Sequence, residues 1–203
     1  MAEKTLDTLF HDTLKDIYYA ERNILKALPK MQRGAEAPEL KQAFEKHKAE
    51  TQGHVERLQQ VFEIIGKRAQ GKTCPAIDGI LDEGEEIMSE YKGTPALDAG
   101  LIAAAQAVEH YEITRYGTLK RWAEVLGMAD AAKLLDATLQ EEAKTDEALT
   151  QLADASANRQ AVAAESASPV RASSVLASSC RVASRSFAAS AMPRTSAQRF
   201  RVP

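Results

Sequence analysis

Hydrophobic side chains recur every three or four residues along most of the first 155 positions, which is the period of an amphipathic α-helix. The repeat is interrupted where glycine, proline and capping residues cluster, so it divides into separate helices. Aromatic residues make up only 5% of a chain that is rich in alanine, leucine, glutamate and lysine, as helical proteins are. We therefore expect four long helices, over about residues 5–32, 38–65, 95–126 and 130–155.

Capping residues predict where these helices begin and end. Thr5 can cap the first helix, and Pro29 should kink or shorten its last turn. Pro38 suits the first position of the second helix. The pair Thr94–Pro95 should open the third helix, and Asp130 should cap the fourth.

Residues 67–93 form a connection that is too long for a simple hairpin between helices. Isoleucine and leucine alternate there with acidic residues, which predicts a short amphipathic helix with a polar outer face. A short link joins antiparallel neighbours, whereas a long link lets the chain cross the length of a bundle. We therefore predict an all-α fold over residues 1–155, a ferritin-like antiparallel four-helix bundle with one long crossover that carries a short extra helix.

The helical period disappears from about Ser156. Ten of the 38 residues from Ser166 onward are serine, and alanine and arginine fill much of the rest. We expect residues 156–203 to form a Ser/Ala/Arg-rich tail that is disordered or weakly structured. An out-of-frame or artificially added end is an alternative explanation of this abrupt change in composition.

The net charge of −3 conceals an uneven distribution of charge. Six of the 26 basic side chains lie after residue 166, so the first 166 residues carry 20 basic and 29 acidic side chains, a net charge of −9. Such an acidic body does not indicate a nucleic-acid partner, and the sparse arginines of the tail form no basic block.

Three features predict a cytoplasmic protein without a membrane partner. The N-terminus lacks the apolar core of a signal peptide, and no window approaches the roughly 20 apolar residues of a membrane span. The two cysteines, Cys74 and Cys180, form neither a CxxC pair nor a zinc-binding spacing, which favours a reducing compartment.

Acidic residues interrupt the helical stripes that should face the core. Glu109 and Glu112 lie three residues apart in the third helix, beside apolar positions. An ionised carboxylate in a dry interior costs several kcal/mol, so a cation, a proton or a metal must neutralise this pair. The same anomaly recurs near the middle of the other three helices, at Glu21, at Glu50, and at Glu142 with Asp146.

A bundle of four helices would bring these acids to a common depth. Two metal ions about 3.5–4 Å apart need bridging and terminal carboxylates as ligands. Oxygen-rich sites with one or two imidazoles suit iron or manganese better than a structural zinc. We therefore predict a site for two iron or manganese ions, with ligands drawn from Glu21, Glu50, His54, Glu109, Glu112, Glu142 and Asp146.

Each candidate ligand also has a simpler interpretation. An acid on a helix is often a solvated or salt-bridged residue, and Asp146 could pair with a neighbouring lysine. His47 and His54 flank Glu50, and such histidines often belong to the core or its rim; we include His54 among the ligands but not His47. His110 points about 100° away from Glu109. Three tyrosines suit packing with their hydroxyls at the boundary, or a relay of electrons to a redox metal: Tyr18, Tyr111 and Tyr116.

Four segments of the chain resemble the bacterial YciE/YciF group. They are LKDIYYAERNILKALPKM, HKAETQGHVERL, LIAAAQAVEHYEITRYGTLKRWAEVLG and LLDATLQEEAKTD, and together they extend over about residues 5–154. The resemblance implies a ferritin-like four-helix bundle that forms a homodimer, holds a two-metal carboxylate centre and takes part in stress responses. The acidic positions that match those of the group are Glu21, Glu50, Glu109, Glu112, Glu142 and Asp146.

The chain departs from the broader rubrerythrin-like pattern, which has Glu-x-x-His on the second and fourth helices. The third residue after Glu50 is Gly53, and a histidine follows only at His54. On the fourth helix Asp146 stands four residues after Glu142. We therefore expect a site dominated by carboxylates. No C-terminal CxxC rubredoxin module is present, so a redox activity would require an external electron donor.

Our leading hypothesis is an oxidoreductase, a cytosolic di-iron or di-manganese bundle that reacts with peroxide or oxygen as a stress defence. The alternative is a non-enzymatic structural or partner-binding helical dimer that holds a structural metal ion or none. Iron storage is a third hypothesis, but it requires a closed shell of many subunits, of which the sequence gives no sign.

Overall fold

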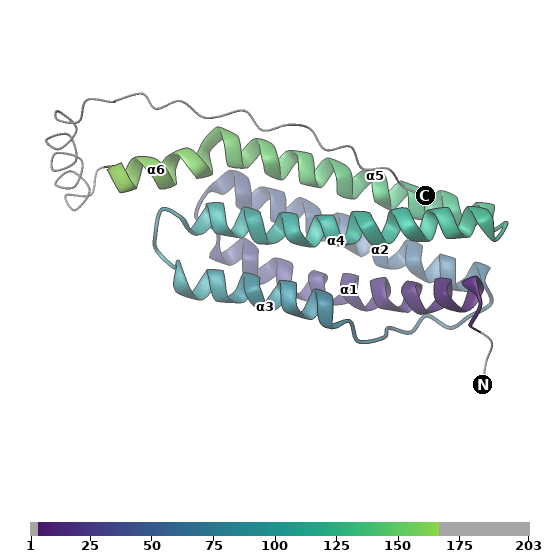
Figure 1. The fold of residues 1–203 in the computed structure, drawn as a ribbon. Helices are drawn as coiled ribbons and strands as arrows, with labels where there is room; N and C mark the ends of the chain where they lie inside the picture. The colour runs from purple at the N-terminus through teal and green to yellow at the C-terminus, as the bar shows by residue number, and fades with distance from the viewer. Residues whose placement is uncertain (1–3, 167–203) are drawn as a thin grey trace, which may run out of the picture. The chain divides into compact units, whose positions relative to one another are not determined.

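The computed structural model describes residues 4–166, and every element in this part of the chain is a helix (Figure 1). The all-α prediction is therefore confirmed, and no described helix is both long enough and apolar enough to cross a membrane. The elements are α1 (Leu6–Gly34), α2 (Pro38–Ile64), α3 (Pro75–Glu90), α4 (Leu97–Val125), α5 (Ala129–Leu152), a π-helical turn (Ala153–Ala157) and α6 (Asn158–Ser166).

The four long helices α1, α2, α4 and α5 form the predicted bundle. α1 and α2 make one antiparallel hairpin and α4 and α5 make another, and the two hairpins pack against each other through α2 with α5 and α1 with α4 (Figure 1). The link between the hairpins returns along the length of the bundle and carries α3, which packs against α4 and α1. α2 and α4 consequently run in the same direction, as expected for a bundle with one long crossover.

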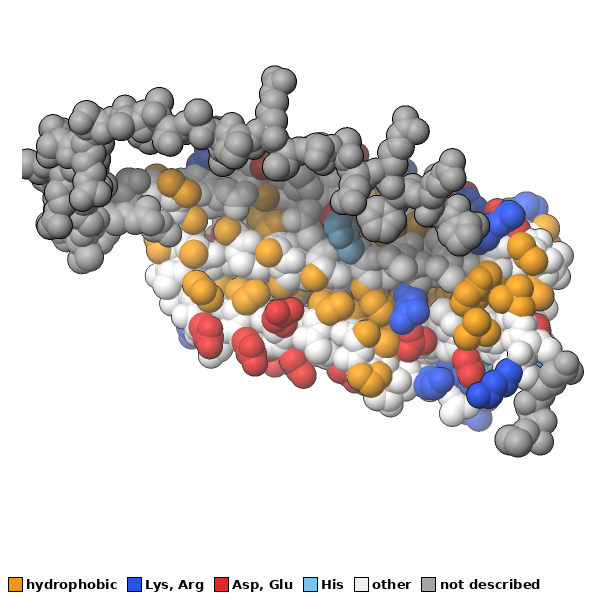
Figure 2. All heavy atoms as spheres, viewed as in Figure 1, with side chains coloured by type: hydrophobic (Ala, Val, Ile, Leu, Met, Phe, Trp, Pro, Cys, Tyr) orange, Lys and Arg blue, Asp and Glu red, His pale blue; other side chains and the backbone are white. Residues whose placement is uncertain are grey.

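The exposed side of α3 is acidic, as its sequence pattern predicts. A row of acidic side chains follows this helix on the face shown in Figure 2. Ile77 is buried on the opposite side, and Gly84 lies against Ala104 of α4. The exposed acids of α3 are Asp82, Glu83, Glu85, Glu86 and Glu90.

The ends of α1 follow the predicted capping pattern. Thr5 is the N-cap, and its hydroxyl accepts a hydrogen bond from the backbone N–H of Thr8 at 3.3 Å. Pro29 lies inside α1 without ending it, and the helix runs on to Gly34. α2 begins with Pro38 at its first position, also as predicted.

The predicted caps of α4 and α5 are each wrong. Thr94 does not open α4, because its hydroxyl donates to the carbonyl of Tyr91 at 2.8 Å, and α4 begins only at Leu97. Asp130 is not the cap of α5 but lies in its first turn, where a carboxylate complements the positive end of the helix dipole and pairs with Lys133 at 3.1 Å.

Helical structure also continues beyond the expected boundary at residue 155. The π-helical turn and α6 extend it to Ser166. Alanine, arginine, glutamine and glutamate in this stretch favour a helix, but few of its side chains are buried, so it has no apolar stripe to detect. The remainder of the tail predicted for residues 156–203, from residue 167 onward, lies outside the described residues.

Asp98 fixes the start of α2 relative to the start of α4. Its carboxylate is 8% exposed and accepts hydrogen bonds from the backbone N–H groups of Glu36 at 2.8 Å and Ala37 at 2.7 Å. The N-cap of α2 is an alanine, which has no polar side chain, so Asp98 supplies the missing acceptors from a neighbouring helix. This contact aligns the two helices that carry most of the buried polar residues.

The apolar core lies at both ends of the bundle and leaves a polar layer between. On α2, Leu40 and Phe44 are buried toward one end, and Leu58 and Phe62 toward the other. Tyr116, Phe10 and Phe62 are the bulkiest fully buried side chains. The buried polar residues of the middle layer form the candidate site.

Candidate metal centre

Six buried ionisable side chains from four helices meet in the middle of the bundle. α4 contributes two because residues three apart lie on one helix face, and α2 contributes two because residues seven apart do so. None of the six is more than 4% exposed. We call them the central cluster; its members are Glu21 of α1, His47 and His54 of α2, Glu109 and Glu112 of α4, and Glu142 of α5.

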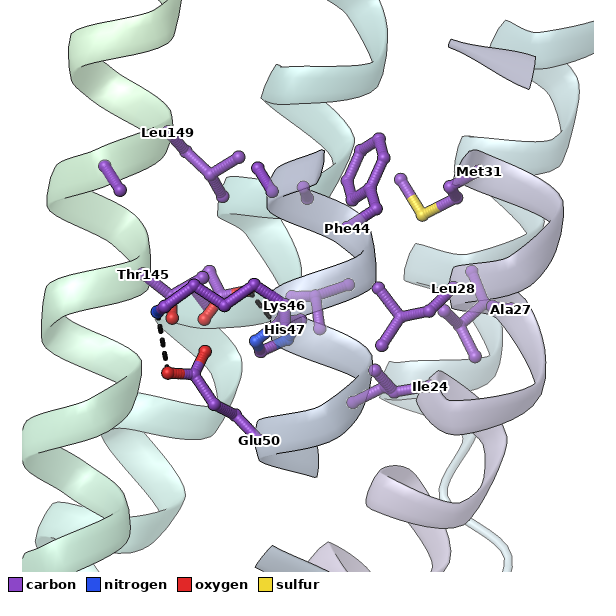
Figure 3. Close-up of a pocket in the computed structure, with 16 residues that line it drawn as sticks. Ile24, Ala27, Leu28, Met31, Phe44, Lys46, His47, Glu50, Thr145 and Leu149 are labelled. Atoms are coloured by element: carbon purple, nitrogen blue, oxygen red, sulfur yellow. Dashed lines mark hydrogen bonds and ion pairs between the residues drawn. The ribbon is translucent and has the colours of Figure 1, made fainter. Parts of the chain in front are cut away.

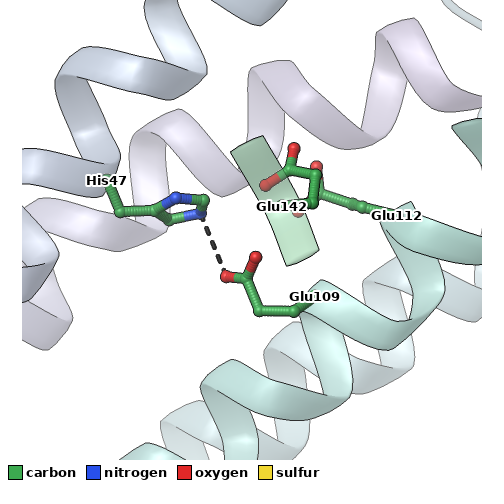
Figure 4. Close-up of side chains that lie close together, drawn as sticks. All are labelled: His47, Glu109, Glu112 and Glu142. Carbon is green, nitrogen blue, oxygen red and sulfur yellow. Dashed lines mark ion pairs between the residues drawn. The ribbon is translucent and has the colours of Figure 1, made fainter. Parts of the chain in front are cut away.

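The central cluster divides into two groups that share Glu142. In the first group, one ligand atom from each of His47, Glu109, Glu112 and Glu142 lies within 4.8 Å of all the others (Figure 4). His47 Nε2 is 3.2 Å from Glu109 Oε1. The 3.2 Å between these two atoms fits a common ion, because ligands about 2.1 Å from a metal are separated by up to about twice that distance.

The second group consists of Glu21, His54 and Glu142, whose ligand atoms also lie within 4.8 Å of one another. His54 Nδ1 is 2.9 Å from Glu142 Oε1 and 3.4 Å from Glu21 Oε1. A carboxylate that belongs to both groups, as Glu142 does, is placed to bridge two ions.

Most of the polar atoms of the cluster lack hydrogen-bond partners. Among the described residues, ten buried side-chain nitrogen or oxygen atoms have no such partner, and all ten belong to the central cluster or to Glu50. The close approaches of His47 and His54 to carboxylates lack the alignment of a hydrogen bond. Each unsatisfied buried group costs about 1–3 kcal/mol of stability, and more if it is charged. We therefore expect these atoms to bind a ligand that the chain itself does not supply.

Burial raises the pKa of three of the four carboxyl groups in the metal-free cluster. It raises the pKa of Glu109 to about 10, and the neighbouring Glu142 adds to the effect. It also raises the pKa of Glu112 well above its usual value, together with the charges of Glu142 and Glu21. The pKa of Glu142 rises for the same first reason, although His54 partly opposes the shift. Metal ions would have to displace the protons that the raised pKa values retain.

The two histidines respond to burial in opposite ways. Burial lowers the pKa of His47 to about 3, and the nearby charge of His54 adds to the shift. Burial alone would also lower the pKa of His54, but interactions with Glu142 and Glu21 outweigh it and raise that pKa to about 10. His47 is therefore a neutral imidazole, the form that binds a metal, whereas His54 must first lose a proton.

His54 is held from its outer side by an ion pair. Its Nε2 lies 3.0 Å from Oε2 of Glu141, and Glu141 is in turn bound by the guanidinium of Arg57. Arg57 Nε also donates to the hydroxyl of Thr138 at 2.9 Å. Burial would raise the pKa of Glu141, but Arg57 outweighs it and lowers that pKa. An ionised Glu141 fixes the Nε2–H of His54, which leaves Nδ1 facing the cluster.

Tyr116 closes the opposite side of the second group. It is fully buried, and its hydroxyl donates a hydrogen bond to Glu21 Oε1. Burial, followed by the charge of Glu21, raises its pKa well above the usual value. Tyr116 is therefore a neutral donor inside the site, rather than a residue at the boundary as its sequence position had suggested.

The structure brings five of the seven sequence-predicted ligands together and leaves two outside both groups. Glu50 pairs with Lys46 at 2.6 Å, and its side chain is 26% exposed, although its other oxygen is buried without a partner (Figure 3). Asp146 accepts a hydrogen bond from Gln106 at 3.0 Å and lies 3.3 Å from His110. The five that meet are Glu21, His54, Glu109, Glu112 and Glu142.

Sequence reasoning missed three contributors to the site. His47 belongs to the first group, although it was not among the predicted ligands. Its position on the buried stripe of α2 was the available signal. Glu141 and Arg57, which hold His54, lie on different helices and left no local signal.

The donor set of the central cluster fits two divalent ions. Four buried carboxylates carry four negative charges when they are ionised, which equals the charge of two divalent cations. Their oxygens and two imidazole nitrogens are ligands suited to iron or manganese. The nine unpartnered atoms of the cluster are the observation in this structure that such ions would explain.

Comparisons with known proteins agree with the resemblance noted in the sequence. The family described as "Domain of unknown function (DUF892)" matches residues 5–162. Protein YciF of Escherichia coli (strain K12) is 43% identical over 162 residues, which cover 79% of this chain and 98% of YciF.

Among the solved structures that match the chain are two with more than 40% sequence identity. The E. coli stress protein YciF is 44% identical, with a TM-score of 0.72, over 74% of this chain and 96% of that one. YcfI of Rhodopseudomonas palustris, for which a structural role has been suggested, is 45% identical, with a TM-score of 0.71, over 74% and 97%. These matches confirm the resemblance to the YciF group and the helical fold.

Proposed function

The chain belongs to the DUF892 family, and on that premise we propose that it is a ferritin-like stress-response protein whose central cluster binds two iron or manganese ions. The observation that carries the proposal is the set of nine buried, unpartnered nitrogen and oxygen atoms that the central cluster holds at the meeting point of four helices. A purely structural core would not require such atoms, because apolar side chains of similar volume would make the protein at least as stable. The relationship to the E. coli stress protein YciF supports the cellular role.

The two groups of the cluster would each hold one ion. His47, Glu109 and Glu112 would bind the first, Glu21 and His54 would bind the second, and Glu142 would bridge them. Bound iron or manganese would supply the electrons for reaction with peroxide or oxygen. The burial of all six side chains keeps bulk water out of this chemistry.

The chain's other residues support the site from outside. Tyr116 holds a proton against Glu21, and the pair of Arg57 and Glu141 orients His54. We propose further that the protein works in the cytoplasm as a homodimer. An external donor would return electrons to the metals, because the sequence contains no CxxC module of the rubredoxin type.

Elemental analysis tests the proposal directly. Protein purified from cells supplied with iron and manganese should contain about two ions per chain. Glu112→Gln should lose most of this metal, because an amide cannot neutralise a cation. Glu147→Gln is the control, since Glu147 is exposed on α5, and it should keep the wild-type content. Wild-type protein that contains neither metal would refute the proposal.

A second candidate function is a structural or partner-binding role, with a structural ion or none. The role suggested for YcfI favours it. Loading the protein with ferrous ions and then adding peroxide or oxygen separates the two functions. A change in the absorption spectrum supports the redox function. A bound metal that raises the melting temperature but does not react would support the structural one.

A further inference from the structure

A small apolar cavity adjoins the central cluster. It has a volume of about 50 Å³ and lies between α1, α2, α4 and α5 (Figure 3). Two members of the first group, His47 and Glu109, form part of its wall. The rest of its buried wall is mainly hydrocarbon and thioether, from Ile24, Leu28, Met31, Phe44, Val108 and Leu149.

The volume and the lining restrict what the cavity can hold. A single water needs about 10–15 Å³ of such space, and a cavity of about 150 Å³ holds benzene, so this one suits a molecule of a few atoms. Water or peroxide would need two to four hydrogen-bond partners, and the hydrocarbon wall offers none. The polar lining residues lie at the end formed by His47 and Glu109 and on the side of Lys46, Glu50 and Thr145; the apolar part between them favours an apolar occupant.

The cavity is reached from solvent between α2 and α5. The lining residues on this side are exposed or half-buried, among them Ala43 and Lys46 of α2 and Thr145 and Ala148 of α5. Three of these four side chains are small, and the ion pair of Lys46 with Glu50 lies along the rim (Figure 3). A small molecule that enters here would reach the central cluster at its His47 end.

We propose that this cavity is a binding and entry site for dioxygen. Dioxygen is apolar and diatomic, so it matches both the wall and the volume, and the polar end would place it against the first metal group. The reaction of dioxygen at the metals rests on the proposed function. The inference adds that dioxygen, rather than peroxide, reaches the metals by this path.

Xenon tests the cavity independently of any metal, because dry apolar cavities bind it. Crystals of the full chain, both metal-replete and chelator-treated, should show xenon in this cavity under pressure. Ala105→Val and Leu28→Phe fill the cavity from α4 and α1, and each should reduce xenon occupancy to about a tenth. Ala137→Val, on the exposed side of α5, is the matched control and should leave occupancy unchanged.

Reaction rates test the path to the metals. Ferrous-loaded protein is mixed with dioxygen or with peroxide, and the spectral change is followed. In Ala105→Val and Leu28→Phe the dioxygen rate should fall about tenfold, while the peroxide rate should change less than about twofold. Melting temperature and metal content establish that each variant compared is folded and loaded. Two cavity-filling variants are used so that the second still gives a result if the first misfolds.

The outcomes separate this inference from the proposed function. No xenon in the wild-type cavity, or equal slowing of both reactions, would overturn the dioxygen site even if the metals are bound. Xenon in the cavity of a protein that never takes up metal would leave a gas-binding cavity and refute the metal function alone. Xenon binding together with selective slowing of the dioxygen reaction would support both.

Discussion

Replacement of Glu109 by glutamine should stabilise the metal-free protein at alkaline pH. Glu109 is 1% exposed, and its pKa is raised to about 10 in the folded chain, compared with 4.5 for an ordinary glutamate. Between these two values the unfolded chain has released the proton while the folded chain still holds it. The free energy of unfolding therefore falls as pH rises, by about 1.4 kcal/mol per pH unit for one such group.

The best window for this measurement is pH 6.5 to 8.5. Below pH 6.5 His47 opposes the effect of Glu109. The folded-state pKa of His47 is lowered to about 3, so in this range the unfolded chain binds a proton that the folded chain does not. The free energy of unfolding therefore gains a contribution from His47 as pH rises, until the histidine of the unfolded chain is also neutral. Above 6.5 that opposition ends. Glu109 alone should then lower the free energy of unfolding by about 3 kcal/mol across two pH units.

His54 adds to the same trend. Its folded-state pKa is raised to about 10, so the stability that it contributes is complete below its usual value of 6.5 and is lost as pH rises toward 10. A substitution at Glu109 should therefore remove only part of the decline. The part that it removes measures the proton held by Glu109.

Urea denaturation followed by circular dichroism provides the assay. Chelator-treated wild type, Glu109→Gln and the exposed control Glu147→Gln are compared at pH 6.5 and 8.5. The wild type and the control should lose at least about 3 kcal/mol between the two values, and Glu109→Gln should lose about 3 kcal/mol less. Saturating metal should abolish the decline in the wild type, because the ion replaces the protons.

A flat stability profile for the metal-free wild type would refute this reasoning. So would a Glu109→Gln variant whose pH dependence equals that of the wild type. Either result would mean that Glu109 is ionised in the folded metal-free chain. The cluster would then be solvated or neutralised by contacts that differ from those in this structure.

Three further predictions concern the residues that support the cluster. Glu141→Ala should weaken metal binding about 10- to 100-fold in competition with a chelator, because His54 loses the group that orients it; helicity should be unchanged. Tyr116→Phe should cost about 1–3 kcal/mol of unfolding free energy in the metal-free protein, since Glu21 loses its hydrogen-bond donor. Asp98→Ala should cost a similar amount, about 1–3 kcal/mol in urea denaturation, because two backbone N–H groups lose their acceptor, while the metal content of the folded fraction stays at the wild-type value.

Periodicity was sufficient to predict most of the buried acids. A step of one residue turns a helix by about 100°, so Glu141 and Glu142 cannot share an environment. The stripe assigned Glu142 to the core, and it is fully buried, whereas Glu141 lies at the rim and binds Arg57. The same reasoning correctly placed Glu109 and Glu112 inside. Such predictions require only that the limits of a helix and the side of it that faces the core are known.

The assignment on α2 required finer use of the same geometry. Seven residues rotate a helix to within about 20° of the starting direction, so His47 and His54 lie on one face, while Glu50 is about 60° away from His47. The family pattern, with a glutamate ligand on the second helix, favoured Glu50 instead. In the structure the face that carries His47 and His54 is the buried one, as the helix geometry indicates, and Glu50 pairs with Lys46.

Contacts between distant segments were beyond sequence reasoning. Asp146 lies on the stripe of α5, but its partners come from α4, and no local pattern indicates that Gln106 and His110 would meet it. The contact between Glu141 and Arg57 depends on how α2 packs against α5. Such contacts follow from the rotation and depth of each helix, which are set by the whole core.

The position of the cluster within the core indicates how metal binding and folding are related. Apolar layers lie on both sides of it along α2, with Leu40 and Phe44 at one end and Leu58 and Phe62 at the other. Those layers are absent from a zinc finger, which folds only when its metal binds. Here they can hold four helices together while Glu109 remains protonated. Chelation should consequently lower the stability of the bundle without removing its helicity, and the metal-free protein should accept its ions as a folded chain.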